Sequence, residues 1–417
     1  MKQISTVIAS TTSQSHGGFT SPIGAHNPRV LVGDMEPEHL YFAFYISHFT
    51  LPSSPHIAII ILNWNGLEDT QQCVDSVLKN SYPNYSIMII DNASDNNEAQ
   101  KIKDYINSKK ITNTFPTVIH VTENNSNLGF AGGNNVGIKK ALSDGADWIF
   151  LLNNDTTVDP NFLTNIISTQ DFTFPKDSNI PNPGIVSTMM INYYDHNKLD
   201  NIGHDLLTTG DTIPRARNQQ PEKYSILKTQ NSQFQTTFGA CAGAALYSAP
   251  MLTQIGLLDD DFFLNYEDSD LSLRAITSGW KTVFCPTSKV YHKINASIGK
   301  IKDTSYRIRS QRNQLWAYLH NTPWPVIILN LPWILFRDIS VILISLITLR
   351  WTITKIFILS RYETLKSAPT IWKKRRKVMK HQKISWWNYW KNQKSFFTTY
   401  WEYFKEIVLE RKSSVME

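Results

Sequence analysis

The sequence predicts an α/β protein built on a parallel sheet, followed by a separate helical region. Two observations lead to this prediction. From His56 onwards, apolar runs that end in polar residues alternate strictly with segments of helical periodicity, which is typical of parallel sheets with right-handed crossovers. From Pro323 onwards the chain is first strongly apolar and then basic and rich in tryptophan. We therefore expect a loose extension over residues 1–54, an α/β domain over 55–300 and a helical region over 301–417.

Composition excludes several classes of protein. The chain has 417 residues, of which 41% are hydrophobic and 12% aromatic, as in globular proteins with a sizeable core. Its three cysteines, Cys73, Cys241 and Cys285, form neither a close pair nor a metal-binding spacing. We therefore expect no disulfide framework and no zinc site, in a reducing compartment. The opening "MKQISTVIASTTSQ" lacks the apolar core of a secretory signal.

The four expected strands all end in polar residues. Because the carboxyl ends of parallel strands meet at one edge of a sheet, ligands bind there. Asn and Asp also favour turns and helix caps, but their coincidence on one edge favours a binding site. The strands and their polar ends are "IAIIILNWNG" with Asn63 and Asn65, "YSIMIIDNASDN" with Asp91 and Asn92, "TVIHVTEN" with Asn124, and "ADWIFLLNND" with Asn153, Asn154 and Asp155.

Three helices are expected between these strands: "EDTQQCVDSVLKN", "EAQKIKDYINS" and the glycine-rich turn and helix "NLGFAGGNNVGIKKAL". In the last, Gly129, Gly132 and Gly133 would let backbone N–H groups approach a ligand, and we include Asn134 in the same binding segment. The spacing matches neither a P-loop nor a dinucleotide fingerprint.

The periodicity weakens between about Gln170 and Gln235, where we expect irregular strands and loops. Beyond it, "FGACAGAALYS" offers small residues at which the backbone can approach something closely. "DLSLRAITSG" predicts a helix that stops at Gly279, and "KTVFCP" and "KVYH" predict two short strands.

An acid that follows two amides at a sheet edge indicates a divalent cation with few protein ligands. Mg²⁺ and Mn²⁺ accept such a site, with phosphate and water as the remaining ligands, so Asp155 is the candidate ligand. A metal there would neutralise a diphosphate. Asp91, one strand away, would accept hydrogen bonds from a base or ribose.

"YEDSD" places three acids just before a helix. Asp270 suits the role of helix cap, which leaves Glu267 and Asp268 for a pocket, where a carboxylate can act as general base on an acceptor hydroxyl. His292 follows a short strand and is either a structural residue or a metal ligand through a neutral ring nitrogen.

The segment from Pro323 to Leu359 is apolar but interrupted by Arg337-Asp338 and by Arg350. Its uninterrupted stretches fall short of the roughly 20 residues that a straight membrane span needs. We expect an interfacial or re-entrant helical hairpin first, true spans with a tolerated Arg-Asp pair second, and a buried helix pair as the plain structural alternative.

The tail is basic and carries spaced aromatic residues. From Arg361 to the end it has 14 lysines and arginines against 5 glutamates, an excess of +9 in a chain of net charge +6, which leaves about −3 for the rest. "KKRRK" precedes Trp386, Trp390, Phe397, Trp401 and Phe404, which recur at helical steps. This pattern indicates a partner with an anionic surface, a membrane rather than nucleic acid. The alternative is a helix that packs on its own domain with its charges solvated.

Four segments together resemble family 2 glycosyltransferases of the GT-A fold, in order and with sensible spacing from about Ile57 to Ser297. They are "IIILNWNGLEDTQQCVDSVLKNSYPNYSIMIIDNASDN", "NLGFAGGNNVGIKKAL", "IFLLNNDTTVDPNFL" and "LDDDFFLNYEDSDLSLRAITSGWKTVFCPTSKVYHKINAS". The branch that they resemble most contains rhamnosyltransferases and galactofuranosyltransferases. The resemblance implies a Rossmann-like, mixed and mainly parallel sheet with helices on both faces.

The resemblance also implies an inverting hexosyltransferase that uses a nucleotide-diphosphate sugar, dTDP-rhamnose or a UDP-sugar, and Mg²⁺ or Mn²⁺. Its acceptor would be a glycan or a lipid-linked glycan, in polysaccharide biosynthesis at the cytoplasmic face of the cell membrane. The residues that fall on family positions are Asn153, Asn154 and Asp155 on the metal-binding Asp-X-Asp, Asp91 on the nucleoside-binding acid, Asp268 with Glu267 on the catalytic base, His292 on a metal-site position, and Asn63 and Asn65 on the first nucleotide-binding loop.

Two other classes of function compete with this one. The first is a catalytically inactive sugar-nucleotide-binding or scaffold subunit, favoured by the amide at Asn153 and opposed by the intact Asp155, Asp268 and His292. The second is a nucleotidyltransferase, which usually has a basic, glycine-rich first loop, whereas "LNWNGLEDT" has no Lys or Arg.

Overall fold

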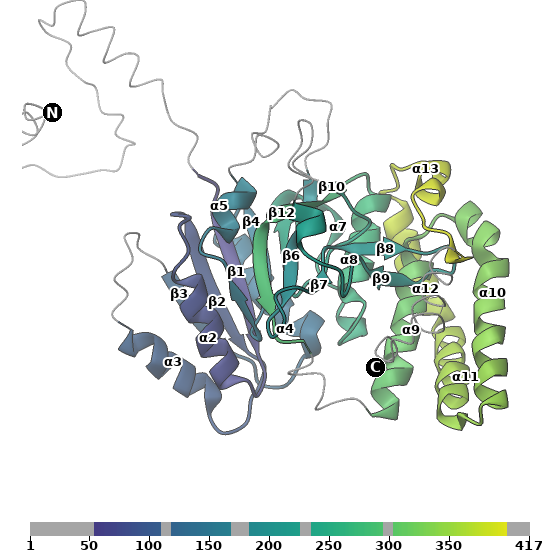
Figure 1. Ribbon diagram of the computed structural model, residues 1–417, viewed down its shortest axis with the longest axis horizontal. Coiled ribbons are helices and arrows are strands. Elements are labelled where there is room, and N and C mark those ends of the chain that lie inside the picture. The colour runs from purple at the N-terminus through teal and green to yellow at the C-terminus, as the bar shows by residue number, and fades with distance from the viewer. Residues whose placement is uncertain (1–53, 110–117, 168–182, 226–234, 295–302, 398–417) are drawn as a thin grey trace, which may run out of the picture. The chain divides into compact units, whose positions relative to one another are not determined.

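The computed structural model describes residues 54–109, 118–167, 183–225, 235–294 and 303–397. The predicted extension over residues 1–54 lies outside these ranges except for its last residue. The described chain begins with an α/β domain whose large sheet has the strand order β10-β12-β6-β11-β4-β1-β2-β3, and ends in a group of helices (Figure 1).

The parallel half of the sheet is formed by four strands that match the expected ones. They are β1 (Ile57–Asn63), β2 (Tyr85–Asp91), β3 (Val118–Glu123) and β4 (Trp148–Asn153). All three pairings among them are parallel, and Asn63 is the register partner of Asp91. The polar residues that end these strands therefore share one sheet edge, as the sequence predicts.

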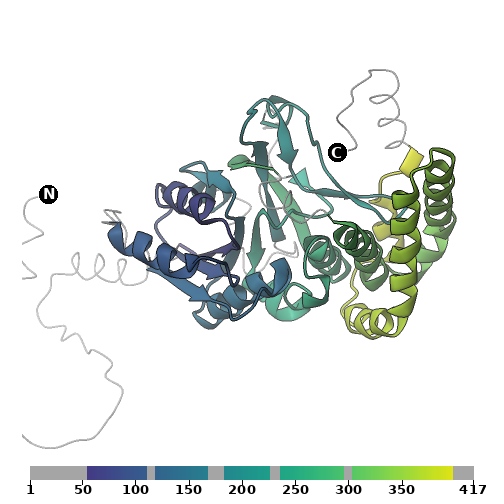
Figure 2. The same ribbon diagram turned by 90° about the horizontal axis from the view of Figure 1, so that it is seen from below.

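Helices cover both faces of the sheet, because alternate strand residues point to opposite sides. Ile57, Ile59 and Ile61 of β1 pack with α2 (Leu67–Val77), α3 (Glu98–Ser108) and α5 (Phe162–Ile167). Ala58 and Ile60 pack on the other side with α4 (Gly129–Ser143), α7 (Ala249–Ile255) and α8 (Glu267–Thr277). Figure 2 shows the two helical layers.

The second half of the sheet makes it mixed, and it contains a long buried strand in the region where the sequence predicts irregular strands and loops. β6 (Pro183–Asn192) is a buried ten-residue strand, parallel to β12 and antiparallel to β11 (Ala244–Ser248). The adjacent polar residues Ser187 and Thr188 interrupt the apolar pattern by which a buried strand such as β6 is recognised in a sequence. Both are buried, and the Thr188 hydroxyl donates to the Ala244 carbonyl at 2.8 Å.

The two short strands expected at the end of the domain are one strand, β12 (Lys281–His292). It keeps its pairing with β6 across an irregularity between Cys285 and Lys289. Its last residues also pair antiparallel with β5 (Thr156–Val158), so that His292 faces Thr156. This pairing brings the end of β12 to the sequence that follows β4.

Smaller strands complete the domain around the sheet edge. β7 (Leu199–Asn201) pairs with β6, β10 (Gln235–Thr236) pairs with β12, and β8 (His204–Leu206) and β9 (Thr212–Pro214) form a separate hairpin. The short helix α6 (Glu222–Ser225) and the 3₁₀ turn η2 (Asp260–Phe262) lie in the connections.

The C-terminal helices are α9 (Thr304–Asn321), α10 (Trp324–Ile347), α11 (Trp351–Lys366), α12 (Ala368–Met379) and α13 (Trp386–Lys391). α9 packs on α8 through a cluster that includes Leu273 and Trp316. α10 and α11 form a helical hairpin, as the sequence predicts, and the hydroxyls of Ser345 and Thr354 lie 2.6 Å apart across it.

The expected basic amphipathic helix of the tail is broken. Residues 392–395 are not helical, and Lys394 instead hydrogen-bonds to β8 through its backbone. The predicted contributions of Trp401 and Phe404 lie outside the described residues. Two of the five basic residues in "KKRRK" serve the fold: Lys374 binds Asp259, and Arg375 is buried and stacks on Trp324.

Candidate active site

A cavity of about 500 Å³ opens at the carboxyl edge of the parallel strands. Its walls come from the ends of β1 and β4, the start of α4, the β8–β9 hairpin, residues 241–243 and the turn that leads into α8. Asn153, Asn154, Asp155, Glu267, Asp268 and His292, which are distant in sequence, all line it.

Asp155 and His292 form the first functional group of the cavity. Asp155 Oδ1 lies 3.3 Å from His292 Nε2, and His292 Nδ1 lies 2.8 Å from Asp200 Oδ2. Burial lowers the pKa of His292, but the two carboxylates outweigh burial and raise that pKa to about 10. Burial raises the pKa of Asp200, yet His292 and Arg217 together hold it below its usual value.

The same group fits a hard divalent cation. Asp155 is 5% exposed, and its Oδ1 is buried without a hydrogen bond. Neighbouring ligands of an octahedral Mg²⁺ lie about 3 Å apart, close to the 3.3 Å between these two atoms. Asp200 on the far ring nitrogen is the partner that orients a metal-binding histidine. An oxygen and an imidazole nitrogen, completed by phosphate and water, suit Mg²⁺ or Mn²⁺.

The two amides before Asp155 take different positions. The Asn154 amide donates to Thr70 Oγ1 at 3.0 Å, which ties the end of β4 to α2. Asn153 is half-buried in the cavity wall, where its side chain leaves little room beside Gly243. Asn153 is therefore the amide placed to meet a ligand beside Asp155, while Asn154 supports the strand end.

Asp268 and Glu267 begin α8 after a sharp turn. Three residues of this turn, Phe263, Asn265 and Tyr266, have φ between 61° and 71°, a conformation that costs non-glycine residues energy and clusters at functional sites. The buried amide of Asn313 in α9 holds the turn by donating to the carbonyls of Phe262, Leu264 and Asn265. The helix packed behind the turn therefore fixes where the two acids point.

The two adjacent acids differ in their hydrogen bonding. Asp268 is half-buried, and its carboxyl oxygens accept the backbone N–H groups of Ser269 at 2.6 Å and of Ala242 at 3.2 Å. Glu267 is buried, and its Oε2 has no hydrogen-bond partner. Burial first, and then the Asp268 charge, raise the pKa of Glu267 to about 8. Glu267 therefore holds its proton near neutral pH, which leaves Asp268 as the candidate base of the pair.

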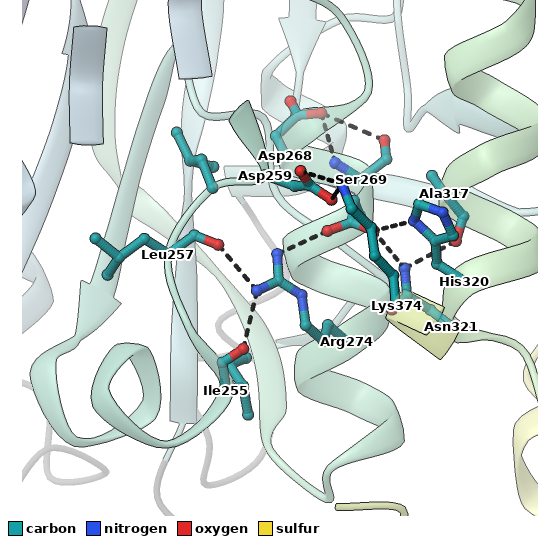
Figure 3. A network of polar contacts seen from close by, with 12 residues as sticks. Ile255, Leu257, Asp259, Asp268, Ser269, Arg274, Ala317, His320, Asn321 and Lys374 are labelled. Carbon is teal, nitrogen blue, oxygen red and sulfur yellow. Dashed lines mark hydrogen bonds and ion pairs between the residues drawn. The ribbon is translucent and has the colours of Figure 1, made fainter. Parts of the chain in front are cut away.

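Asp270 corrects the prediction of a helix cap. It lies inside α8, and its carboxylate binds Arg274 at 2.6 Å and the Asn321 amide at 2.7 Å, with His320 at 3.5 Å. Burial raises its pKa, but Arg274, His320 and Asn321 together outweigh burial and hold the pKa of Asp270 well below its usual range. Figure 3 shows Arg274 of α8 and the α9 residues His320 and Asn321 meeting in this network.

The predicted nucleotide-binding residues form an internal network. Asp91 is 1% exposed and accepts the Asn63 amide and the Ser94 hydroxyl, both at 2.7 Å. Asn65 has φ 52° and binds Asp95. None of Asn63, Asn65 and Asp91 lines the cavity. Their neighbours Leu62, Trp64 and Asn92 do, so this network shapes the cavity wall from behind.

The sequence predicts that the glycine-rich segment lets backbone N–H groups approach a ligand, but the structure places most of this segment inside α4. Gly129 starts α4 with φ +72°, and its N–H donates to Asn127 at 2.8 Å. Gly133 and Asn134 are buried within the helix. A Cβ at Gly133 would lie 2.6 Å from Leu62 Cδ1, and the Asn134 amide donates to the Phe130 carbonyl. Of these positions only Gly129 reaches the cavity.

The sequence did not predict several residues of the cavity wall, most of which come from the region of weak periodicity. The structure adds His204, Arg217 and Cys241 to the cavity wall and Asp200 behind His292. The sequence shows that these side chains are charged or reactive, which is a weak signal of function. It does not show which residues on other strands they meet.

The cavity at the edge of the mixed sheet carries Asp155 and His292 together with Glu267 and Asp268, a set of residues compatible with a nucleotide-sugar-dependent glycosyltransferase. Residues 58–256 match the family profile of Glycosyl transferase family 2. The α/β domain is therefore a family 2 glycosyltransferase domain, the family that the sequence resembles, and the finer branch stays a prediction.

The structure is similar to that of the mannosyltransferase PcManGT from Pyrobaculum calidifontis, which was solved in complex with GDP-Man and Mn²⁺. The two sequences are 13% identical, the TM-score is 0.47, and the match covers 78% of this chain and 94% of that chain. TarS residues 1–349 from S. aureus, solved in complex with UDP, is also 13% identical, with a TM-score of 0.44 over 78% of this chain and 88% of that chain. No curated protein matches the sequence significantly.

Proposed function

We propose that this protein is an inverting, membrane-associated transferase that moves rhamnose, or otherwise galactofuranose or another hexose, from a nucleotide-diphosphate sugar to a hydroxyl of a glycan or lipid-linked acceptor. The observation that carries the proposal is one cavity whose walls carry Asp268 together with Asp155 and His292. dTDP-rhamnose is the first donor to test and UDP-sugars the next, in line with the branch that the sequence resembles.

The reaction needs one base and no covalent sugar intermediate. Asp268 takes the proton of the acceptor hydroxyl, whose oxygen attacks the anomeric carbon from the face opposite the diphosphate. The bond between that carbon and the diphosphate oxygen breaks, and its electron pair leaves with the nucleotide. Mg²⁺ or Mn²⁺, held by Asp155 and His292, would neutralise that leaving group. Glu267, with its raised pKa, adds no second negative charge beside the base near neutral pH.

The donor and the chemistry are tested together with purified full-length protein. It is incubated with Mg²⁺ or Mn²⁺, a panel of nucleotide sugars and lipid-linked glycan acceptors, and release of nucleoside diphosphate is measured. One donor of the panel should be turned over. Binding of a donor without turnover for any donor and acceptor pair would favour the inactive scaffold subunit instead.

The membrane part of the proposal depends on the two sides of α10. Its inward stripe carries polar residues that are paired with the rest of the chain: Asn330 donates to the Tyr318 hydroxyl at 2.9 Å, and Arg337 binds Asp211 of the β8–β9 hairpin. Its outward side exposes large apolar side chains. They are Trp324, Ile328, Leu329, Leu331, Trp333, Leu335, Phe336, Ile339, Leu343, Ile344 and Ile347.

A helix that pairs its central polar residues inward and exposes many large apolar side chains on its other side is suited to lipid rather than water. α10 is long and apolar enough to cross a membrane by length and composition. Arg337 and the neighbouring Asp338 lie midway along it, however, and they bind Asp211 and Arg361. A span would carry these charges to the bilayer centre, which is costly. We therefore favour a helix lying in the interface of the cytoplasmic leaflet.

Vesicle co-sedimentation of the full-length protein tests this attachment. Binding to vesicles with anionic phosphatidylglycerol should exceed binding to neutral vesicles and weaken with salt. The double substitution Ile339→Glu and Leu343→Glu should abolish it. Val118→Glu, which alters an exposed apolar residue at the far sheet edge, is the matched control and should bind normally. Equal binding by both variants would refute the role of α10.

A further inference from the structure

Three potential metal ligands meet in the wall of the cavity, apart from the Asp155–His292 group. They are His204 of β8, Cys241 in the segment before β11, and Asp268 of α8. One ligand atom from each lies within 4.8 Å of the other two. The three residues are far apart in sequence, so their spacing gives no metal-binding motif. The fold alone brings them together.

The polar atoms of this cluster are poorly satisfied by the protein. His204 Nδ1 is buried without a hydrogen-bond partner, although an unpaired buried polar atom costs about 1–3 kcal/mol. Cys241 carries a free thiol. Asp268 Oδ2 accepts one hydrogen bond, at 3.2 Å, from the backbone N–H of Ala242. Each residue therefore keeps coordinating capacity that faces the cavity.

The backbone fixes the position of the histidine and the thiol. The N–H of His204 donates to the Gly239 carbonyl at 2.8 Å, and the His204 carbonyl accepts the N–H of Phe238 at 3.1 Å. These bonds clamp β8 to the segment that carries Cys241 two residues later. A preformed cluster with little freedom to move apart is what a metal site requires.

We infer that His204, Cys241 and Asp268 form a second metal site, selective for a thiophilic divalent cation such as Zn²⁺. A thiolate, an imidazole nitrogen and a carboxylate oxygen are the ligands that Zn²⁺ takes in sites that keep a fourth position for water or another ligand. The site at Asp155 and His292 has no sulfur ligand, which favours the harder Mg²⁺ or Mn²⁺. The cavity thus holds two cation sites of different preference.

Occupation of the second site would inhibit the enzyme, a consequence that rests on the proposed role of Asp268. A carboxylate bound to Zn²⁺ is a poor acceptor for the proton of the sugar-acceptor hydroxyl. Zn²⁺ would therefore block transfer even while Mg²⁺ or Mn²⁺ and the donor are bound. The metal binding itself does not depend on the proposed function.

The binding test uses full-length protein and Co²⁺ alone as a spectroscopic substitute for Zn²⁺, without nucleotide sugar. Titration should produce one equivalent of a thiolate-to-cobalt charge-transfer absorption, which Zn²⁺ then displaces. Cys241→Ser should lose this absorption. Cys73→Ser, which alters a buried cysteine of the core, should keep it, and Cys285→Ser replaces that control if Cys73→Ser does not fold. Loss of a residue that only orients a metal ligand weakens metal binding about 10–100-fold. His204→Ala removes a ligand itself and should therefore weaken Co²⁺ binding by more than that.

Absence of the absorption in the wild type, or its persistence in Cys241→Ser, would overturn the site. The inhibitory role is measured separately. In an active preparation with excess Mg²⁺, Zn²⁺ should stop turnover of the wild type and a chelator should restore it, while any residual turnover of Cys241→Ser should resist Zn²⁺. An inactive preparation that still shows the cobalt absorption would refute the proposed function but not the metal site.

Discussion

Replacement of Asp270 by alanine should destabilise the protein by about 3 kcal/mol. The Asp270–Arg274 pair joins two consecutive turns of α8, with side chains only 3% and 11% exposed. Breaking a buried pair costs about 3–5 kcal/mol, because the remaining charge stays buried. In this variant Arg274 still donates hydrogen bonds to the carbonyls of Ile255 and Leu257, both at 2.9 Å. The expected loss therefore lies at the lower end of that range.

The Lys140–Asp144 pair provides a matched control. It has the same spacing of four residues on a helix, but its side chains are 53% and 31% exposed. Exposed pairs of this kind contribute about 0.3–0.5 kcal/mol. The free energy of unfolding of Asp270→Ala and Asp144→Ala is measured by urea denaturation followed by circular dichroism. A loss below about 1 kcal/mol for Asp270→Ala, or equal losses in both variants, would refute the structural role of the Asp270 network.

Two further predictions concern the cavity wall. Asp200→Asn should weaken Mn²⁺ binding about 10–100-fold, because Asp200 orients His292. The control is Asp195→Asn, which alters an exposed acid of the same segment. This control should leave the Kd for Mn²⁺, measured by isothermal titration, unchanged. Gly129→Ala should lower the free energy of unfolding about 1–3 kcal/mol more than Gly145→Ala. Both glycines have positive φ, but a Cβ at Gly129 would lie 2.4 Å from a backbone oxygen, whereas Gly145 faces open space. Equal urea midpoints for the two alanine variants would contradict this packing role.

The parallel half of the sheet and its polar edge could be predicted from the sequence because the signals are local. β1, β2 and β4 are apolar runs that end in Asn or Asp, and α3 matches its expected range. Local signals failed for β6, where Ser187 and Thr188 interrupt the pattern although their hydroxyls are buried in the sheet.

The composition of the candidate site was only partly predictable because it depends on long-range pairing. Asp155 and His292 are brought together by antiparallel pairing of β5 with β12, and Cys241 reaches Asp268 through contacts that no spacing encodes. Asp270 has the sequence context of a cap, yet the left-handed turn at Tyr266 starts the helix earlier. Its true partner Asn321 lies on another helix.

The proposed mechanism depends most directly on Asp268. Wild-type protein and Asp268→Asn are compared, with the donor that the panel identifies, for donor affinity by isothermal titration and for release of nucleoside diphosphate in the presence of acceptor. Asn keeps the shape of the side chain but cannot accept the proton, and general-base catalysis contributes typically about 10²–10⁴-fold. We predict an unchanged Kd for the donor and a fall in kcat of at least about 100-fold. A kcat within a few-fold of the wild type would remove Asp268 from the mechanism.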